Sequence, residues 1–238
     1  MTLRLWFAVA MTATIVIRSD RTDEQYLALG ARFPAVAKIG RAGDGTLITP
    51  DWVLTAGHVA AGMDTSRARV YLGDVAYRIR RVVVHPEWRE LGPHDIALIQ
   101  LDRPVSGIAT IPLYAGHDEV GMIATIVGHG DTRTGLGGAW KQDGLARGAT
   151  SKVESVDGGD LVFRFHAPPA GTDLEGAPGR GDSGGPALIQ VNGAWFIAGV
   201  SSAGYDGTYG PGTYGAVDHF TRVSDYVAWI EGEIQKGH

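Results

Sequence analysis

Short apolar runs separated by turn residues follow one another along most of this chain. They are rich in Val, Ile, Leu and aromatic residues, and no helical segments alternate with them, which argues against a parallel sheet of strand–helix–strand units. Runs of this length at short spacing are typical of an antiparallel β-sandwich or β-barrel. The runs are AVAKIG, GTLITP, WVLTAG, RVYLG, YRIRRVVV, DIALIQL, MIATIVG, LVFRF, GGPALIQV and WFIAGVSS.

Helical periodicity is clear only at the end of the chain. Ser224 stands where an N-cap is expected, and the segment SDYVAWIEGEIQKGH places apolar residues at helical spacing. We therefore predict a terminal helix over about 224–236. Its apolar face is expected to contain Tyr226, Val227, Ile230 and Ile234.

Composition limits the class of protein. With 238 residues the chain can bury a large core, and all-β domains of this size are commonly single. The stretch LDRPVSGIATIPLYAGHDEVG, with two prolines and three glycines, is expected to link two halves of similar length. A net charge of -5 gives no basic patch, so nucleic acid is not an expected partner. The sequence holds no cysteine, which excludes disulfides and thiolate chemistry.

The first residues, MTLRLWFAVAMTATIVIRSD, resemble a short signal peptide. An early arginine is followed by an apolar run and an A-x-A triplet, and the run is too short to span a membrane. We expect residues 1–14 to be a leader, and the protein to be secreted or periplasmic. The alternative is that Ile15, Val16 and Ile17, which are all β-branched, simply belong to a first strand.

The stretch PGRGDSGGPALI sets Asp182 and Ser183 among glycines, immediately before an apolar run. A plain turn needs one or two glycines, whereas Gly181, Gly184 and Gly185 indicate a backbone with unusual dihedral angles or one that another molecule approaches closely. A serine held in this way is a candidate nucleophile. Because serine is a weak nucleophile at its free pKa, it needs a base and a group that orients the base.

Two other segments supply those groups. His58 in WVLTAGHVA follows a β-rich run and has small neighbours that leave room for its ring. Asp95 in HDIALIQL opens a strand so apolar that we expect it to be buried, where an unpaired carboxylate is costly. A histidine N–H is a suitable partner for that carboxylate, although a lone histidine is more often a packing or surface residue.

In this order and at these separations, LTAGHVA, HDIALI and GDSGGPALI resemble the three signature segments of the trypsin/chymotrypsin-like serine peptidases. The YVAWI helix and the segment GHGDTRTG, similar to the family's Gly-x-Gly turn, extend the resemblance over about 15–230. It implies an all-β fold of two perpendicular six-stranded antiparallel β-barrels with a C-terminal α-helix. Residues 15–238 would form one protease domain, with its first barrel over about 15–110 and its second over about 120–223.

The resemblance also implies a catalytic triad in a secreted serine endopeptidase. Ser183 would attack the scissile carbonyl and form an acyl-enzyme, His58 would accept and return the proton, and Asp95 would orient His58. The backbone N–H groups of Gly181 and Ser183 would form the oxyanion hole, which accounts for the glycines. The alternative is a catalytically silent relative that uses the same surface for binding, although the triad and these glycines are all present.

The family's pattern further indicates the residues that bind substrate. Ala177, six residues before Ser183, stands where trypsin-like relatives have an aspartate, and on its own it indicates an uncharged pocket. The family's aromatic-Thr-Arg-Val segment matches at Phe220, nine residues before Trp229, better than at the earlier Tyr214. That register places an acidic residue, Asp218, at the base of the pocket.

We therefore expect cleavage after Arg or Lys. The pocket walls would be VSSAG, which contains Ser202 and Gly204, and EGAPGR, and between them Asp218 would attract a cationic side chain. Arg180 beside the oxyanion loop would favour acidic residues near the cleavage site. The alternative is that Asp218 is a solvated loop residue and that the pocket takes small or aromatic side chains.

Activation is expected to require a new amino terminus. Asp182 lies beside the nucleophile in a segment expected to be buried, so its charge needs a cation. In the family this cation is the ammonium of a cleaved terminus that begins with a branched apolar residue, and Ile15-Val16 fits that pattern. No basic residue stands just ahead of Ile15, so leader removal rather than trypsin-type cleavage would create the terminus. The alternative is that Ile15 is only a strand residue.

The chain departs from the family pattern at its missing cysteines and in its short 72–82 segment. That segment lacks the acidic pair with which some relatives hold calcium, so we expect no metal and no cofactor. The expected partners are a protein or peptide substrate and a protein inhibitor, without a membrane, and the expected state is a monomer. Five other histidines are interpreted as turn, loop or surface residues: His85, His94 beside the triad aspartate, His117, His129 and His166.

Overall fold

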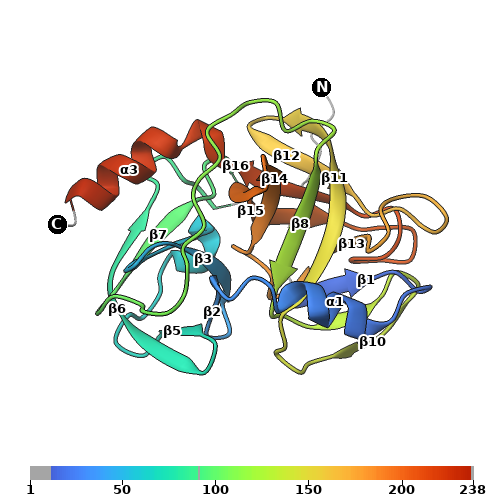
Figure 1. Ribbon diagram of the computed structural model, residues 1–238, viewed down its shortest axis with the longest axis horizontal. Coiled ribbons are helices and arrows are strands. Elements are labelled where there is room, and N and C mark those ends of the chain that lie inside the picture. The colour runs from blue at the N-terminus through green and yellow to red at the C-terminus, as the bar shows by residue number, and fades with distance from the viewer. Residues whose placement is uncertain (1–11, 91, 237–238) are drawn as a thin grey trace.

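The computed structural model describes residues 12–90 and 92–236 and contains two closed six-stranded antiparallel barrels that lie side by side (Figure 1). The strand order is β2-β3-β4-β7-β6-β5 in the first barrel and β11-β12-β16-β15-β14-β8 in the second. The predicted fold class, two such barrels with a C-terminal helix, is confirmed. Most of the predicted leader, residues 1–11, lies outside the described residues.

All six strands of the first barrel come from predicted runs. The most apolar of these runs, DIALIQL, gives a strand that is buried along its whole length. Fully buried side chains such as Leu47, Val53 and Ile99 fill the barrel. The strands are β2 (Val36–Ile39), β3 (Gly43–Thr49), β4 (Trp52–Thr55), β5 (Arg69–Leu72), β6 (Val75–Val84) and β7 (Ala97–Leu101).

The second barrel combines four predicted runs with two strands that were not predicted, β11 and β16. Its core includes the ring pair of Phe163 and Phe220, whose centroids lie 5.0 Å apart in an edge-to-face arrangement. The strands are β8 (Ile123–Gly128), β11 (Arg147–Asp157), β12 (Asp160–Arg164), β14 (Pro186–Val191), β15 (Ala194–Tyr205) and β16 (Val217–Arg222).

A further four-stranded sheet has the order β10-β9-β1-β13. Its members are β1 (Thr12–Ile17), β9 (Thr132–Thr134), β10 (Gly137–Lys141) and β13 (Gly176–Arg180). Strand β1 therefore lies outside both barrels, although the first barrel was expected to begin near residue 15. Strand β13 leads directly into residues 181–185, which we call the serine loop, so β1 is paired with the strand that carries this loop.

Two helices were not predicted. Helix α1 (Asp23–Gly30) packs on β11 and buries Tyr26, whose hydroxyl donates a 2.8 Å hydrogen bond to the carbonyl of Glu175. A sequence signal for α1 exists, because Gln25 accepts a hydrogen bond from the backbone of Thr22 as in a capping box. Helix α2 (Gly57–Ala60) is a single turn directly after β4.

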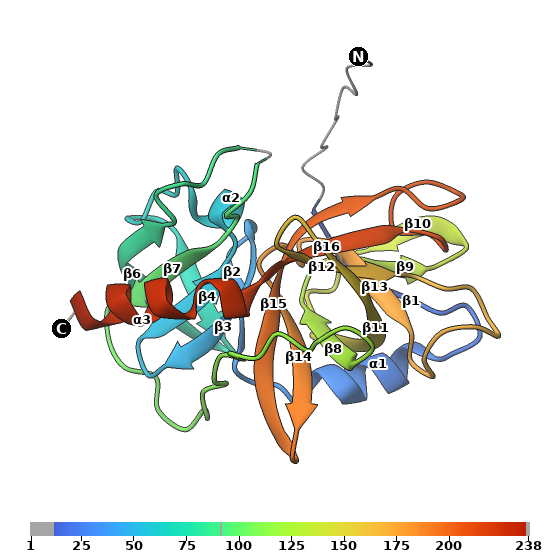
Figure 2. The ribbon, with the colours of Figure 1, turned by 90° about the horizontal axis from the view of Figure 1, so that it is seen from above.

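The predicted terminal helix is present as α3 (Val227–Lys236) but begins later than expected. A 3₁₀ turn, η1 (Val223–Asp225), precedes it and contains Ser224. The Ser224 hydroxyl donates a 3.3 Å hydrogen bond to Glu119, so it does not act as the predicted N-cap. Helix α3 runs along the first barrel (Figure 2) and buries Ile230 in that barrel's core.

The segment between β7 and β8 connects the two barrels, as the proline and glycine content of this stretch indicated. It contributes an isolated bridge between Leu113 and Ile197 of β15. Among the helices of the described residues, none has both the length and the apolar character needed to cross a membrane.

Candidate active site

His58 and Asp95 form a pair joined by two hydrogen bonds. His58 lies on α2, and Asp95 precedes β7 and is buried. The backbone N–H of His58 donates to Asp95 Oδ1 at 2.8 Å, and His58 Nδ1 lies 2.7 Å from Asp95 Oδ2. Because the carboxylate accepts at Nδ1, the proton of the neutral ring is held there and Nε2 is left as the basic nitrogen. The predicted contact between these two residues is therefore present.

Further groups hold the Asp95 carboxylate in its charged form. The hydroxyl of Ser202 donates a 2.6 Å hydrogen bond to Asp95 Oδ2. The hydroxyl of Thr221 donates one of 3.0 Å to the backbone carbonyl of Asp95 and so fixes the main chain there. Burial alone would raise the pKa of Asp95, but the hydrogen bonds and charge of His58 and the hydroxyl of Ser202 outweigh it and hold the pKa below its usual range. Ser202, expected only in a pocket wall, thus contacts the aspartate directly.

The serine loop packs against the chain that leads into His58. Gly184 has a φ of 80°, and a Cβ there would lie 2.2 Å from Thr55 Oγ1 and 3.0 Å from the backbone nitrogen of Ala56. Only glycine fits this approach. Ser183 is half-buried in the same loop, and within residues 12–90 and 92–236 its hydroxyl forms no hydrogen bond. Catalytic hydrogen bonds are commonly long before substrate binds.

Two backbone N–H groups of the serine loop are free to bind an anion. Gly181 has a φ of 103°, which other residues rarely adopt. In the described part of the chain, the N–H groups of Gly181 and Ser183 donate to no other residue, whereas the N–H of Gly184 donates to the carbonyl of Ser201 at 2.8 Å. The loop thus leaves unpaired the two donors that the family resemblance assigns to the oxyanion hole.

Asp182 belongs to the serine loop, and its carboxylate is buried. It accepts hydrogen bonds from the backbone N–H groups of Gly179 at 2.9 Å and Gly130 at 3.2 Å. Burial, together with the negative charge of Asp44, raises the pKa of Asp182 to about 8. The predicted need of this carboxylate for a cation is consistent with that shift.

The fully buried Asp44 and the half-buried His129 form a pair next to Asp182 that the sequence did not indicate. The backbone N–H of His129 donates to Asp44 Oδ2 at 2.8 Å, and His129 Nδ1 lies 3.0 Å from Asp44 Oδ1. Burial lowers the pKa of His129, but the charges of Asp44 and Asp182 outweigh it and raise the pKa overall. His129, expected in a loop or at the surface, is thus a partner of buried carboxylates.

The start of the described chain reaches the region of Asp182 through β1. Val16 pairs with Ala177, and Ala13 pairs with Gly179, whose N–H is bonded to Asp182. Ile15 itself is fully buried in the middle of the strand. Its nitrogen is therefore a peptide nitrogen here, and it becomes an ammonium group only after cleavage.

Asp218, which the sequence analysis assigned to the base of the substrate pocket, lies on β16 and is buried. It is opposite Gly204 in the pairing of β15 with β16, and a Cβ on Gly204 would lie 2.7 Å from Asp218 Oδ1. Burial, and next the charge of Asp182, raises the pKa of Asp218 to about 8. Its carboxylate has no hydrogen-bond or ion-pair partner among the residues that the structure describes. Asp218 is therefore a buried acid, not a solvated loop residue.

The other two predicted pocket residues lie on β13. Ala177 is buried against Val16 and Tyr214. The guanidinium of Arg180 lies 5.1 Å from the ring centroid of Trp140, and its Nε is buried without a partner among the described residues. Arg180 thus stacks on an aromatic ring at the edge of the site.

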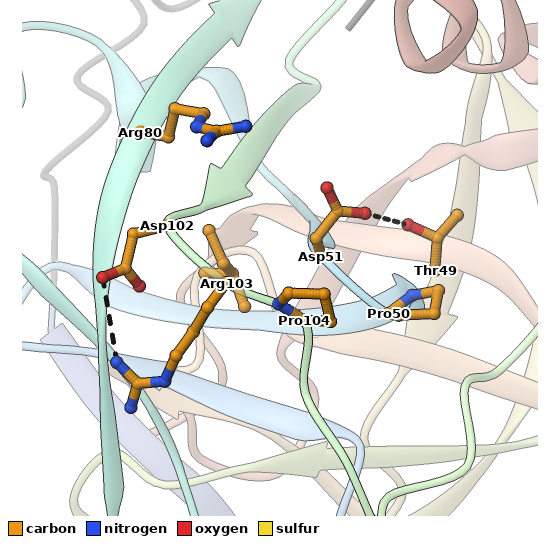
Figure 3. A pocket seen from close by; sticks show the side chains of 8 residues that line it. Thr49, Pro50, Asp51, Arg80, Asp102, Arg103 and Pro104 are labelled. Carbon is orange, nitrogen blue, oxygen red and sulfur yellow. Dashed lines mark hydrogen bonds and ion pairs between the residues drawn. The ribbon is translucent and has the colours of Figure 1, made fainter. Parts of the chain in front are cut away.

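One surface hollow lies on the first barrel, away from these residues. It has a volume of about 430 Å³, and Figure 3 shows acidic and basic side chains together with two prolines in its lining. The Thr49 hydroxyl donates to Asp51, and Asp102 pairs with Arg103 at 3.7 Å. Its acidic groups therefore already have partners. The lining residues are Thr49, Pro50, Asp51, Arg80, Leu101, Asp102, Arg103 and Pro104.

Two antiparallel six-stranded barrels, with a His–Asp pair from the first beside a glycine-rich serine loop from the second, define a trypsin-like serine protease fold. Comparison with known families agrees, because the model of the Trypsin family matches residues 28–230. The chain belongs to the trypsin family of serine endopeptidases.

Three curated relatives are 29–30% identical to the chain over the residues that align with it. Vitamin K-dependent protein C of Mus musculus is 30% identical over 222 residues, which are 81% of this chain and 46% of that protein. Chymotrypsin-like elastase family member 1 of Rattus norvegicus is 30% identical over 210 residues, 80% of this chain and 77% of the elastase. The Canis lupus familiaris elastase is 29% identical, with 80% of each chain covered. The chain thus spans about half of protein C and most of the elastases.

Proposed function

We propose that this chain is an active serine endopeptidase whose nucleophile is Ser183, whose base is His58 and whose orienting carboxylate is Asp95. The observation that carries the proposal is the doubly hydrogen-bonded His58–Asp95 pair, which fixes the ring with Nε2 free. The close approach of Gly184 to Ala56 supports it, because it brings the serine loop against the turn that carries His58.

The proposed reaction has two halves. Ser183 Oγ attacks the scissile carbonyl while its proton passes to His58 Nε2, and the tetrahedral oxyanion accepts hydrogen bonds from the Gly181 and Ser183 N–H groups. His58 then protonates the leaving amine, which leaves an acyl-Ser183 ester. Water, deprotonated by the same nitrogen, hydrolyses the ester and restores the hydroxyl. Asp95 stays ionised throughout and stabilises the imidazolium.

The alternative is a silent relative that binds a protein without cleaving it. Hydrolysis of a denatured protein by the wild type and by Ser183→Ala separates the two functions. We expect cleavage by the wild type and loss of at least about a thousandfold in Ser183→Ala, since the nucleophile is removed. If the wild type with its amino terminus at Ile15 does not cleave the protein, the binding function is supported.

We further propose that Asp218 directs cleavage after Arg or Lys. Its carboxylate is buried without a counter-ion, so an entering guanidinium or ammonium supplies the missing charge, whereas a neutral side chain leaves the acid unpaired. Since the pKa of Asp218 is raised to about 8 before substrate binds, entry of the cation at pH 7 releases a proton.

Peptides with Arg or its neutral isostere citrulline at P1 test this preference. We expect kcat/KM to be at least tenfold higher for Arg in the wild type, and the ratio to approach one in Asp218→Asn. The ratio in the wild type should rise as pH increases from 6 to 9, because Asp218 ionises more readily. Preferred cleavage after Phe, Leu or Ala that is unchanged in Asp218→Asn would contradict the assignment.

Activation is proposed to follow release of Ile15 as a new amino terminus. Its ammonium would pair with Asp182, which lies beside Gly179, the partner of Ala13 on β13. Removal of residues 1–14 as a leader would produce that terminus in a secreted or periplasmic protein, whose partners are protein substrates and protein inhibitors. N-terminal sequencing of the active protein is the test: a terminus at or near Ile15 is expected, and full activity with Met1 intact would contradict it.

A further inference from the structure

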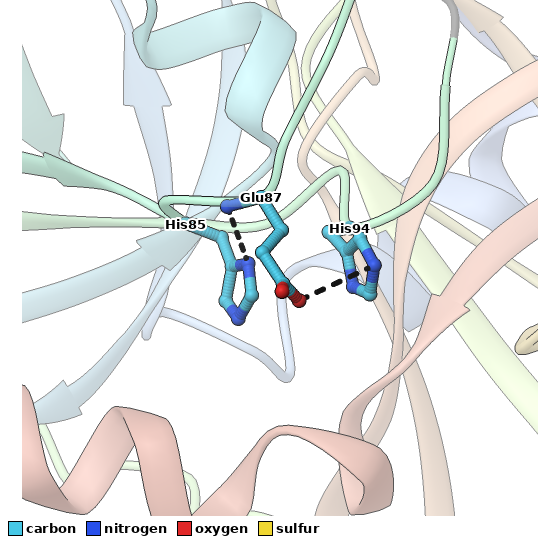
Figure 4. Close-up of side chains that lie close together, drawn as sticks. All are labelled: His85, Glu87 and His94. Atoms are coloured by element: carbon cyan, nitrogen blue, oxygen red, sulfur yellow. Dashed lines mark hydrogen bonds and ion pairs between the residues drawn. The ribbon is translucent and has the colours of Figure 1, made fainter.

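Three metal-ligating side chains gather on the first barrel next to the triad aspartate. His85 follows β6, Glu87 lies two residues further, and His94 immediately precedes Asp95 (Figure 4). One ligand atom from each of the three residues lies within 4.8 Å of the other two. The proposed catalytic mechanism uses none of them.

The two imidazole rings are already held close together. The rings of His85 and His94 stack at a centroid distance of 5.0 Å and an angle of 14°. Tyr226 lies edge-on to both rings, and Trp229 packs on His85 at 4.8 Å. These aromatic side chains, which lie at the C-terminal helix, restrict the rotation of both imidazole rings. A bound ion would therefore remove little further conformational freedom from the rings.

His94 has the hydrogen bond that a metal-binding histidine needs. Its Nδ1 lies 3.0 Å from the Tyr226 hydroxyl, which can accept the Nδ1 proton and leave Nε2 for a metal. The same Nε2 lies 3.7 Å from Glu87 Oε2. Two ligands of a tetrahedral zinc ion are about 3.3 Å apart, given bonds of about 2.0 Å. The Glu87 side chain is 71% exposed and free to make that small adjustment.

Metal binding breaks one weak hydrogen bond of His85. Its Nδ1 accepts a hydrogen bond of 3.3 Å from the backbone N–H of Glu87, so the proton of the neutral ring is on Nε2. A metal on Nδ1 displaces this bond directly. A metal on Nε2 displaces it indirectly, because the ring proton then moves to Nδ1, which can no longer accept. The bond is long, and Glu87 is exposed, so water can replace it.

We propose that His85, Glu87 and His94 bind one divalent transition-metal ion of the zinc class, with water completing a tetrahedral shell. Two imidazoles and one carboxylate are a donor set that suits such an ion, whereas calcium prefers oxygen ligands alone. His94 has a left-handed backbone conformation, with a φ of 64°, and directly precedes Asp95. The metal would therefore also hold in place the backbone next to the proposed triad. The sequence predicted no metal because the 72–82 segment lacks the acidic pair of the calcium-binding relatives, and His85, Glu87 and His94 lie outside that segment.

Zinc titration of the untagged chain tests the site, with Ser183→Ala as the background to prevent self-digestion. Competition with a chromophoric chelator should give one site with a micromolar or tighter Kd, and Co²⁺ should give the visible absorption of a tetrahedral site. His85→Asn and His94→Asn should each weaken binding at least tenfold. His117→Asn is the matched control, since this exposed histidine pairs with Asp225 and is not one of the three proposed ligands, and it should leave Kd unchanged.

Glu87→Gln protects the test against misfolding, because its side chain is exposed and the substitution keeps its size. It should weaken Zn²⁺ binding at least tenfold while the melting temperature without metal stays that of the parent. Zinc should raise the melting temperature of the parent chain and of His117→Asn only. Binding weaker than millimolar in the parent, or equal binding in the parent and in His85→Asn/His94→Asn, would overturn the proposal.

Discussion

The backbone N–H of Asp44 donates a 2.8 Å hydrogen bond to the carbonyl oxygen of Ser183. A strand of the first barrel, β3, thereby holds the serine loop of the second. The Asp44 side chain extends the same support, since it binds His129, whose neighbour Gly130 donates to Asp182. The serine loop is thus fixed on two sides before any substrate binds.

His129→Gln is expected to destabilise the protein. The substitution keeps the size of the side chain but removes the imidazole, whose Nδ1 lies 3.0 Å from the carboxylate of the fully buried Asp44. Loss of one partner of a buried ion pair costs about 3 kcal/mol. Urea unfolding in the Ser183→Ala background measures the loss, and labelling of the otherwise wild-type protein by a serine-directed probe should slow as the loop loosens.

His219→Gln is the matched control for that experiment. The His219 side chain is 17% exposed and that of His129 is 18% exposed, but His219 pairs with a partly exposed Asp160 at 3.5 Å. Its unfolding free energy should fall by less than about 1 kcal/mol. Equal losses in the two variants would contradict a special role for His129.

Ser202→Ala is expected to lower kcat about tenfold with little change in KM. The hydroxyl donates to Asp95 Oδ2 at 2.6 Å, and a hydrogen bond to a charged group contributes about 1.5 kcal/mol or more. Without it, the carboxylate orients His58 less firmly while the substrate pocket keeps its shape. Steady-state kinetics beside the exposed Ser155→Ala variant provide the test, and unchanged kcat in both would show that His58 alone positions Asp95.

The stability of the uncleaved chain should fall as pH rises from about 4 to 8, in part because of Asp218. Its pKa is about 8 in the folded chain against an ordinary 3.8, so between these values the folded state holds a proton that the unfolded state has lost. One such proton changes the unfolding free energy by up to about 1.4 kcal/mol per pH unit.

Asp218→Asn isolates this contribution. The amide cannot ionise, so the variant should gain stability relative to its parent between pH 5 and pH 8, whereas the exposed Asp157→Asn control should not. Urea midpoints in the Ser183→Ala background measure the difference. Parallel pH dependence of Asp218→Asn and its parent would show that Asp218 ionises normally in the folded chain.

The sequence predicted the first barrel more completely than the second, for a physical reason. The first barrel's strands are continuous apolar runs such as DIALIQL, which is buried throughout. Strands β11 and β16 were not predicted, because RGATSKVESVD and VDHFTR alternate small, polar and charged residues. Their residues are buried by neighbours that are distant in sequence, and local patterns do not carry that information.

The site residues likewise divide into those that the sequence predicted and those that it did not. Motifs sufficed to bring His58 and Asp95 together, because each motif combines a chemical group with the strand that positions it. The Asp44–His129 pair was not predicted, since its members are 85 residues apart and neither stands in a distinctive motif. Asp218 required a choice of register at Phe220. The structure pairs Gly204 with Asp218, and the role of Asp218 in the substrate pocket stays a prediction.

Labelling with a fluorophosphonate probe tests the central claim most directly, because the probe reacts only with a serine that is activated by its neighbours. Peptide mapping of the labelled wild type should place the adduct on Ser183 alone. Ser183→Ala should take no label, and His58→Ala should react at least a hundredfold more slowly, since the base is gone. An adduct on another residue, or equal labelling of the wild type and His58→Ala, would contradict the proposed triad.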